Sequence, residues 1–147
     1  MGVALLDVNA LLALLVENHD FHPRMSQWFA AHQTSGWATC PITEQGFARI
    51  ISNPNYIKPA SKVLTAITLL KTTFGASASH QFWDDDLPLK GMSDDLQKRI
   101  SGPKQITDAY LLALAMQHKG RLVTFDRRIL QLAPKGTAEY SALDILQ

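Results

Sequence analysis

The stretch that decides the fold is Val-Ala-Leu-Leu-Asp-Val-Asn-Ala-Leu-Leu, residues 3–12. Its first four residues form a short apolar run with the composition of a buried strand. Asp7 ends this run, and apolar residues at helical spacing follow, which predicts a helix from Asn9 to about Glu17. Short apolar strands that alternate with helices are typical of a parallel sheet covered on both faces.

The rest of the chain repeats this alternation. We expect strands at 36–39, 80–83, 121–124 and, more weakly, within 138–145, and helices at 21–31, from Pro41 to Asn53, at 61–74, near 93–100 and at 106–119. Thr107 is the expected cap of the helix at 106–119, and Gly120 is its expected stop. The sequence therefore predicts an α/β fold, a three-layer α/β/α sandwich with a mostly parallel central sheet, in one domain over residues 1–147.

Composition excludes several classes of protein. With 147 residues, 46% of them apolar and 18% charged, the chain has the size of one globular domain and is not disordered. The apolar stretches around 10–16 and 109–116 are far shorter than the ~20 residues of a membrane span. The start, residues 1–7, lacks the basic region of a signal peptide. Cys40 is the single cysteine, which excludes an internal disulfide and a cysteine-cluster zinc site and fits a cytoplasmic location.

Net charge gives no overall sign of a nucleic-acid partner. The chain has 14 basic and 13 acidic residues, a formal net charge of +1, so contacts with nucleic acid would depend on local patches and metal ions. Basic residues group at two places, where they could follow an RNA backbone or simply form a solvated surface. These groups are Lys98, Arg99 and Lys104, and Lys119, Arg121, Arg127 and Arg128.

Four acidic residues stand where the predicted strands and helices meet. Asp7 and Asp126 directly follow strands, while Glu44 and Asp108 lie in the first turns of helices. Because the carboxyl ends of parallel strands meet at one edge of the sheet, where ligands collect, we expect the four carboxylates to meet in one pocket. Taken singly, each acid also has a local explanation, since helix starts favour acids and aspartate caps helices.

A cluster of carboxylates needs a positive charge. Two unit charges ~4 Å apart repel by several kcal/mol at an effective dielectric constant of ~20. Protons or hard divalent cations offset this repulsion, and an oxygen-only donor set favours Mg²⁺ or Mn²⁺ over zinc. Carboxylate-bound Mg²⁺ is the usual machinery for hydrolysing phosphodiester bonds.

Four segments together resemble the PIN-domain family, and specifically the VapC-type ribonuclease toxins of prokaryotic toxin–antitoxin pairs. The resemblance extends from Leu5 to about Ala133. The segments are Leu5-Leu6-Asp7-Val8-Asn9-Ala10-Leu11-Leu12, Cys40-Pro41-Ile42-Thr43-Glu44-Gln45-Gly46-Phe47-Ala48-Arg49-Ile50, Ile106-Thr107-Asp108-Ala109-Tyr110-Leu111-Leu112-Ala113-Leu114-Ala115 and Leu122-Val123-Thr124-Phe125-Asp126.

The resemblance implies a PIN-like sandwich, Mg²⁺ or Mn²⁺ as cofactor, and cleavage of single-stranded or looped RNA. It also implies a homodimer silenced by a cognate VapB-like antitoxin protein. The resemblance also implies that the family's four acids match Asp7, Glu44, Asp108 and Asp126 in chain order, and that its supporting polar residues match Asn9 and Thr124.

We assign roles on this basis. Asp7 and Asp108 are expected to contact the metal directly, and Asp126 to complete its shell or orient the attacking water. Glu44 is expected to act as a ligand or as a general base through a water molecule. Asn9 and Thr124 are expected to hydrogen-bond the carboxylates.

Two other functions stay open from the sequence. Aspartyl-phosphate phosphatases also place an aspartate nucleophile after the first strand, with a second aspartate two residues on, but Asn9 stands at that position. A non-catalytic module that binds a partner protein or RNA is the other alternative. Incubation with RNA, with and without divalent metal, separates these functions.

Overall fold

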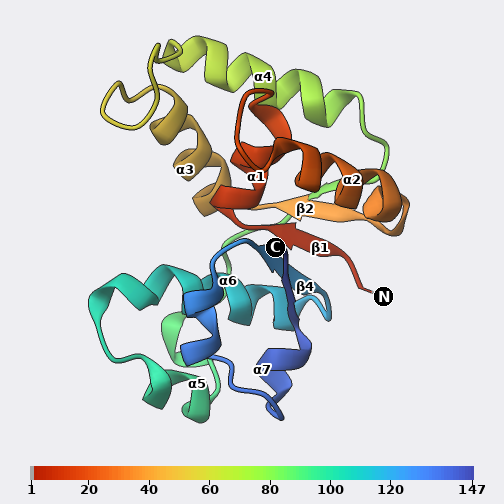
Figure 1. The fold of residues 1–147 in the computed structure, drawn as a ribbon. Coiled ribbons are helices and arrows are strands. Elements are labelled where there is room, and N and C mark those ends of the chain that lie inside the picture. The colour runs from red at the N-terminus through yellow and green to blue at the C-terminus, as the bar shows by residue number, and fades with distance from the viewer. Residues whose placement is uncertain (1) are drawn as a thin grey trace.

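The computed structural model of the protein describes residues 2–147. Within them, five parallel strands form one sheet in the order β3-β2-β1-β4-β5 (Figure 1). The strands are β1 Ala4–Leu6, β2 Trp37–Thr39, β3 His80–Phe82, β4 Arg121–Thr124 and β5 Leu143–Ile145. The sheet thus contains strands from both ends of the chain, β1 and β5. Its central strand, β1, is the apolar run that precedes Asp7.

Helices cover both faces of the sheet, as the three layers of Figure 1 show. One layer contains α1 Val8–Leu15, α2 His22–His32, α3 Pro41–Ile51 and α4 Val63–Gly75, and the other contains α5 Asp94–Arg99, α6 Ile106–Gln117 and α7 Ala138–Ser141. Single 3₁₀ turns are η1 Gln33–Ser35, η2 Leu89–Gly91, η3 Pro103–Gln105 and η4 Arg127–Gln131. The predicted α/β/α sandwich is confirmed, and the sheet is parallel throughout.

The alternation of side chains along the strands creates the two cores. Leu6 and Val123 pack with the layer of α1 to α4, whereas Leu5 and Leu122 pack with the layer of α6. Successive strand residues face opposite sides of a sheet. When helices cover both faces, every side chain of a central strand is buried, so an apolar strand such as β1 is expected. The helix α6 is buried from Ala109 to Ala115, which explains why its sequence is apolar nearly all round.

Two predicted details of α6 are wrong. Thr107 is not its cap: the helix begins at Ile106 as a continuation of the turn η3, and Gln105 precedes it without a side-chain cap bond. At the other end Lys119, not Gly120, has the left-handed backbone conformation, with φ of 55°. Gly120 is required for a different reason, because a Cβ atom there would collide with the carbonyl oxygen of Val3. Close approach to β1 therefore selects this glycine.

The parallel register brings the candidate acids to one edge. Leu6 pairs with Val123, and the backbone N–H of Asp7 donates to the carbonyl of Val123 at 2.9 Å. The helices α1 and α3 cross closely at Gly46, where a Cβ atom would lie 2.6 Å from the Cγ2 of Val8. In the part of the chain that the structure describes, no helix has the length and apolar character needed to cross a membrane.

Candidate active site

Asp7 is the most constrained of the candidate acids. It is only 7% exposed, and its backbone conformation makes it the N-cap of α1. Its Oδ1 accepts a hydrogen bond from the N–H of Val8 at 2.7 Å, and its Oδ2 accepts one from the hydroxyl of Thr124 at 2.8 Å. Burial raises the pKa of Asp7, the bonds from Thr124 and Val8 oppose this rise, and the charge of Asp126 adds to it. Asp7 therefore caps α1 with one carboxylate oxygen and bonds to β4 with the other.

A hydrogen-bond network connects the ends of β1 and β4. The hydroxyl of Thr124, which is fully buried, also accepts from the side-chain amide of Asn9 at 3.0 Å and from the backbone N–H of Asp126 at 3.1 Å. The side-chain carbonyl of Asn9 accepts from the N–H of Phe125 at 3.0 Å. Asn9 and Thr124 thus connect the side chain of Asp7 to the backbone of Phe125 and Asp126.

Asp108 lies in the first turn of α6 and shares its surroundings with these two acids. Its pKa is raised to about 6, first by burial and then by repulsion from Asp7 and Asp126, while Arg128 opposes the shift. The repulsion shows that the three carboxylates, which come from distant parts of the chain, act electrostatically on one another.

Asp126 is paired with an arginine. The side chain of Arg128 donates to Asp126 from Nε at 3.0 Å and from Nη2 at 2.7 Å. This pair lowers the pKa of Asp126. Because the side chain of Arg128 is 83% exposed, the pair is screened by water and contributes little to stability.

Glu44 is oriented differently from the other three acids. Its Oε2 accepts a hydrogen bond from the buried hydroxyl of Thr39 at 2.7 Å, and the Nε2 of His80 lies 2.8 Å from the same hydroxyl. Since this hydroxyl has one hydrogen and gives it to Glu44, His80 is assigned the tautomer that donates from Nε2. Burial lowers the pKa of His80 to about 4.

One open pocket of about 520 Å³ brings three of the four acids together. Asp7, Asp108 and Asp126 line it, with Asn9 beside them; Glu44 does not belong to its lining. The remaining lining residues are Val8, Leu12, Ile42, Gly46, Arg49, Ile50, Tyr56 and Thr107. The geometry therefore brings together three of the predicted carboxylates and leaves the fourth at the side of the pocket.

The donor chemistry of this pocket fits a hard divalent cation. Among residues 2–147 no three His, Cys, Asp or Glu side chains are grouped closely enough to enclose a metal ion. Mg²⁺, however, retains several water ligands and is commonly held by one or two carboxylates together with substrate phosphates. The oxygen-only donors, and the mutual repulsion of Asp108 with its two neighbours, match that mode of binding.

Several polar residues that line the pocket were not site candidates from the sequence. Tyr56, which is 72% exposed, lies in the loop after α3, and Thr107 stands beside Asp108. An aromatic residue in the proline- and asparagine-rich loop at 53–60 was the available signal. Arg49 also reaches the pocket, although it lies five residues beyond Glu44 on α3.

Part of the expected basic surface is occupied. Arg121 is only 7% exposed and forms an ion pair with Asp144 at 3.6 Å, so it is not available to follow an RNA backbone. Arg99 pairs with Glu139 at 3.2 Å. Both arginines are therefore engaged in ion pairs within the fold. At these two positions the structure supports neither contact with an RNA backbone nor a fully solvated surface.

Comparison with known proteins assigns the class. The family model described as PIN domain matches residues 4–135, and the chain belongs to the PIN-domain family. The fold agrees with the crystal structure of PAE2754 from Pyrobaculum aerophilum, with a TM-score of 0.60 and 21% identity over 98% of this chain and 84% of that one.

Within that family the chain is similar to the VapC ribonucleases of Mycobacterium tuberculosis (strain ATCC 25618 / H37Rv). It is 45% identical to Ribonuclease VapC44 over 95% of this chain and 97% of the relative, and 45% identical to Ribonuclease VapC38 over 89% and 90%. Ribonuclease VapC39 is 41% identical over 92% of this chain and 97% of the relative. The predicted membership, PIN-domain family and VapC type, is confirmed.

Proposed function

We propose that this protein is an endoribonuclease toxin of a toxin–antitoxin pair, which hydrolyses RNA phosphodiester bonds with a carboxylate-bound Mg²⁺ or Mn²⁺ ion. The observation that carries the proposal is the meeting of Asp7, Asp108 and Asp126 around one open pocket at the carboxyl edge of the sheet. The names of the VapC relatives support the same activity. We propose that residues 1–147 act as one PIN-like nuclease domain.

Asp7 and Asp108 are the residues proposed to hold the metal ion, with Asp126 completing the site once Arg128 releases it. A bound divalent ion lowers the pKa of an attacking water and stabilises charge on the leaving oxygen. The protein contributes position: Thr124 and Val8 direct the two oxygens of Asp7. A cation bound between these acids would offset the repulsion from Asp7 and Asp126 that, after burial, raises the pKa of Asp108.

Glu44 is proposed as a ligand or as a general base through a water molecule. Its Oε2 is engaged by Thr39, so the other oxygen, Oε1, is the one for this role. The buried hydroxyl of Thr39, contacted by the half-buried ring of His80, holds the carboxylate in one orientation, which is what a general base requires.

The proposed partners are an RNA substrate, a VapB-like antitoxin and a second copy of the chain in a homodimer, in the cytoplasm. The relatives' names support an antitoxin partner. Large apolar side chains on α4 remain exposed, Val63 at 58%, Leu64 at 73% and Ile67 at 47%. Adjacent exposed apolar residues are typical of surfaces that another protein covers.

The phosphatase alternative finds no support at Asn9. Its amide nitrogen donates to the Thr124 hydroxyl, and its carbonyl oxygen accepts from the backbone of Phe125. Asn9 thus acts as a structural connector of β1 and β4, whereas a phosphatase needs a general acid at this position.

The test is a cleavage assay on the purified, antitoxin-free protein. We expect total RNA to be cut in Mg²⁺ or Mn²⁺ and to stay intact in chelator. Asp7→Asn and Asp108→Asn should abolish cutting, while Asp84→Asn, a change at an exposed acid outside the pocket, should not. Cleavage in chelator, or full activity of either pocket variant, would refute the proposal, and sequencing the RNA ends would identify the target.

A further inference from the structure

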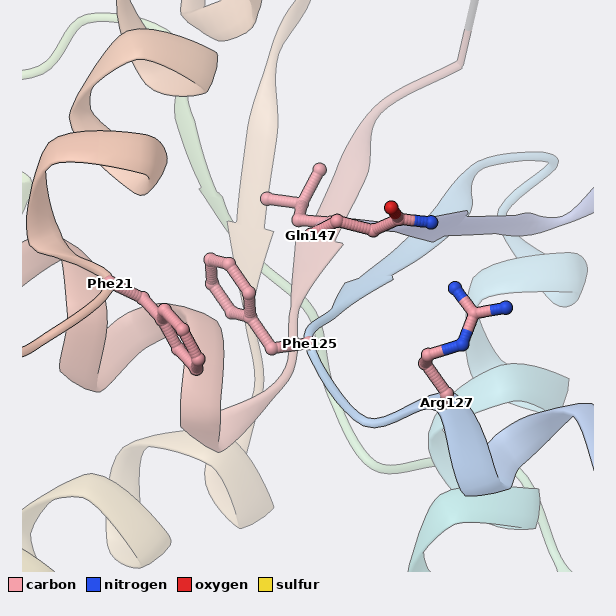
Figure 2. A pocket seen from close by; sticks show the side chains of 5 residues that line it. Phe21, Phe125, Arg127 and Gln147 are labelled. Atoms are coloured by element: carbon pink, nitrogen blue, oxygen red, sulfur yellow. The ribbon is translucent and has the colours of Figure 1, made fainter.

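A second hollow is lined by Phe125 and Arg127, the two chain neighbours of Asp126, which lines the acid pocket. Figure 2 shows it between the start of α2, the end of β4 and the last residues of the chain. Its volume is about 480 Å³, and Phe21, Phe125, Arg127, Leu146 and Gln147 line it. That volume is large enough for one small planar group.

The wall of the hollow is a stacked pair of aromatic rings. The rings of Phe21 and Phe125 are nearly parallel, at 12°, with centroids 4.8 Å apart. Phe21 is 48% exposed, so an apolar ring face meets water at the mouth of the hollow. A flat ring face exposed to solvent is the surface on which a nucleobase stacks, and such stacking tolerates any base.

The same backbone segment carries both the hollow and the acid pocket. Phe125 lies between Thr124, which binds Asp7, and Asp126, which lines the acid pocket. The hollow and the acid pocket are thus lined by consecutive residues of one segment, which places a base in the hollow next to the acids. The hydrogen bond from the N–H of Phe125 to Asn9 at 3.0 Å ties the backbone of Phe125 to α1, next to Asp7.

Cationic side chains line this hollow and the one next to it. Arg127 is exposed and forms no ion pair within residues 2–147. It also lines an adjoining hollow of about 360 Å³ together with Lys135 and Tyr140. This is a basic path with aromatic side chains at intervals, the arrangement by which proteins hold single-stranded nucleic acid. It contrasts with Arg121 and Arg128, which are paired with acids.

We infer that this hollow is a base-binding subsite: an unpaired base next to the cleaved phosphodiester stacks on Phe21, and Arg127 contacts the adjoining phosphate. The inference rests on the proposed ribonuclease function. It adds a substrate-positioning site formed by residues outside the acid pocket.

The test measures binding of a short oligoadenylate to protein that cannot cut it, in the Asp108→Asn background. Phe21→Ala should weaken binding about five- to twentyfold, within the range of one lost base stack. Phe21→Trp should retain it. Phe82→Ala is the matched control, since Phe82 is 53% exposed on β3 at the other edge of the sheet, and it should bind as the parent does.

A second readout separates stacking from a change of shape. An oligoadenylate with 2-aminopurine at one position should lose fluorescence on binding, and Phe21→Ala should remove this loss. Removing that base from the RNA should weaken binding to the parent by the same factor and leave Phe21→Ala unchanged. Phe21→Leu keeps an apolar contact with Phe125 but lacks the flat ring, so a folded Phe21→Leu protein should resemble Phe21→Ala. Arg127→Gln should reduce the slope of log affinity against log salt by about 1.

Several outcomes would overturn the inference. Equal binding by Phe21→Ala and Phe82→Ala would do so, as would an equal effect of base removal on every variant. A Phe21 substitution that weakens only an antitoxin protein's binding would assign the hollow to that protein. Metal-dependent cleavage by the wild-type chain tests the proposed function separately. If the wild-type chain cuts RNA but Phe21 substitutions do not change binding, only the subsite is refuted. If the wild-type chain does not cut RNA at all, the proposed function is refuted.

Discussion

Replacing Thr124 by valine is expected to damage both stability and cleavage, because this one hydroxyl connects the two strand ends that carry the acids. It is fully buried. It donates to Asp7 at 2.8 Å and accepts from Asn9 at 3.0 Å and from the N–H of Asp126 at 3.1 Å. Valine has nearly the same shape but neither donates nor accepts, so the packing stays while the bonds are lost.

The size of the effect follows from these contacts. A hydrogen bond to a charged group contributes about 1.5–3 kcal/mol, and a buried group left without a partner costs about 1–3 kcal/mol. Because the donors of Asn9 and Asp126 can recruit water at the pocket, we expect a total loss of about 2–4 kcal/mol. For a chain of this size that lowers the unfolding midpoint by about 5–15 °C. Cleavage should fall about 10- to 100-fold, the usual effect of losing a partner that orients a metal ligand.

The assay pairs thermal unfolding in chelator with cleavage in Mg²⁺, and the cleavage reaction is run well below the unfolding midpoint. Thr137→Val is the matched control: the Thr137 hydroxyl accepts from Tyr140 and caps α7, so its loss should cost about 1 kcal/mol without slowing cleavage. Wild-type cleavage by Thr124→Val would refute the reasoning. A comparable loss of cleavage in Thr137→Val would show that lowered stability alone explains the result.

Three further changes test other contacts. The pKa of Asp108 in the folded protein is about 6, above its ordinary 3.8. The stability of the metal-free protein should therefore decline as pH rises from about 4 to about 6. After discounting for partial exposure, Asp108→Asn should raise the unfolding midpoint by about 2–4 °C at pH 8 and leave it unchanged at pH 4. Asp144→Ala leaves buried Arg121 unpaired and should cost about 2–3 kcal/mol in denaturant unfolding, whereas a loss below about 1 kcal/mol would contradict this. Arg128→Gln removes the cation that competes for Asp126 and should tighten Mg²⁺ binding severalfold in calorimetry; weaker binding would show that Arg128 supports the metal site.

Much of the fold was predictable because its signals are local. The apolar runs at 3–6 and 121–124 became β1 and β4, and the acids that end them, Asp7 and Asp126, lie at the same edge of the sheet. A buried strand must be apolar on both faces, and a parallel sheet sends all its carboxyl ends one way. These constraints act within a few residues, so a single sequence displays them.

The prediction for Glu44 shows where this reasoning ends. A first-turn acid can point into the pocket or back toward the strand, and the hydroxyl of Thr39 draws Glu44 toward β2. Thr107 fails as a cap for a related reason, since the preceding turn η3 already leads into α6. In both cases a neighbouring group, the hydroxyl of Thr39 or the turn η3, determined the position of the residue.

By itself, the sequence determined the order of strands and helices, the edge at which function is sought and three carboxylates that lie there. Only the tertiary structure decided that Arg121 is buried against Asp144 and that Phe21 stacks on Phe125. The physical reason is that hydrophobic periodicity acts between near neighbours in the chain, whereas ion pairs and ring contacts depend on which distant segments the sheet order β3-β2-β1-β4-β5 brings together.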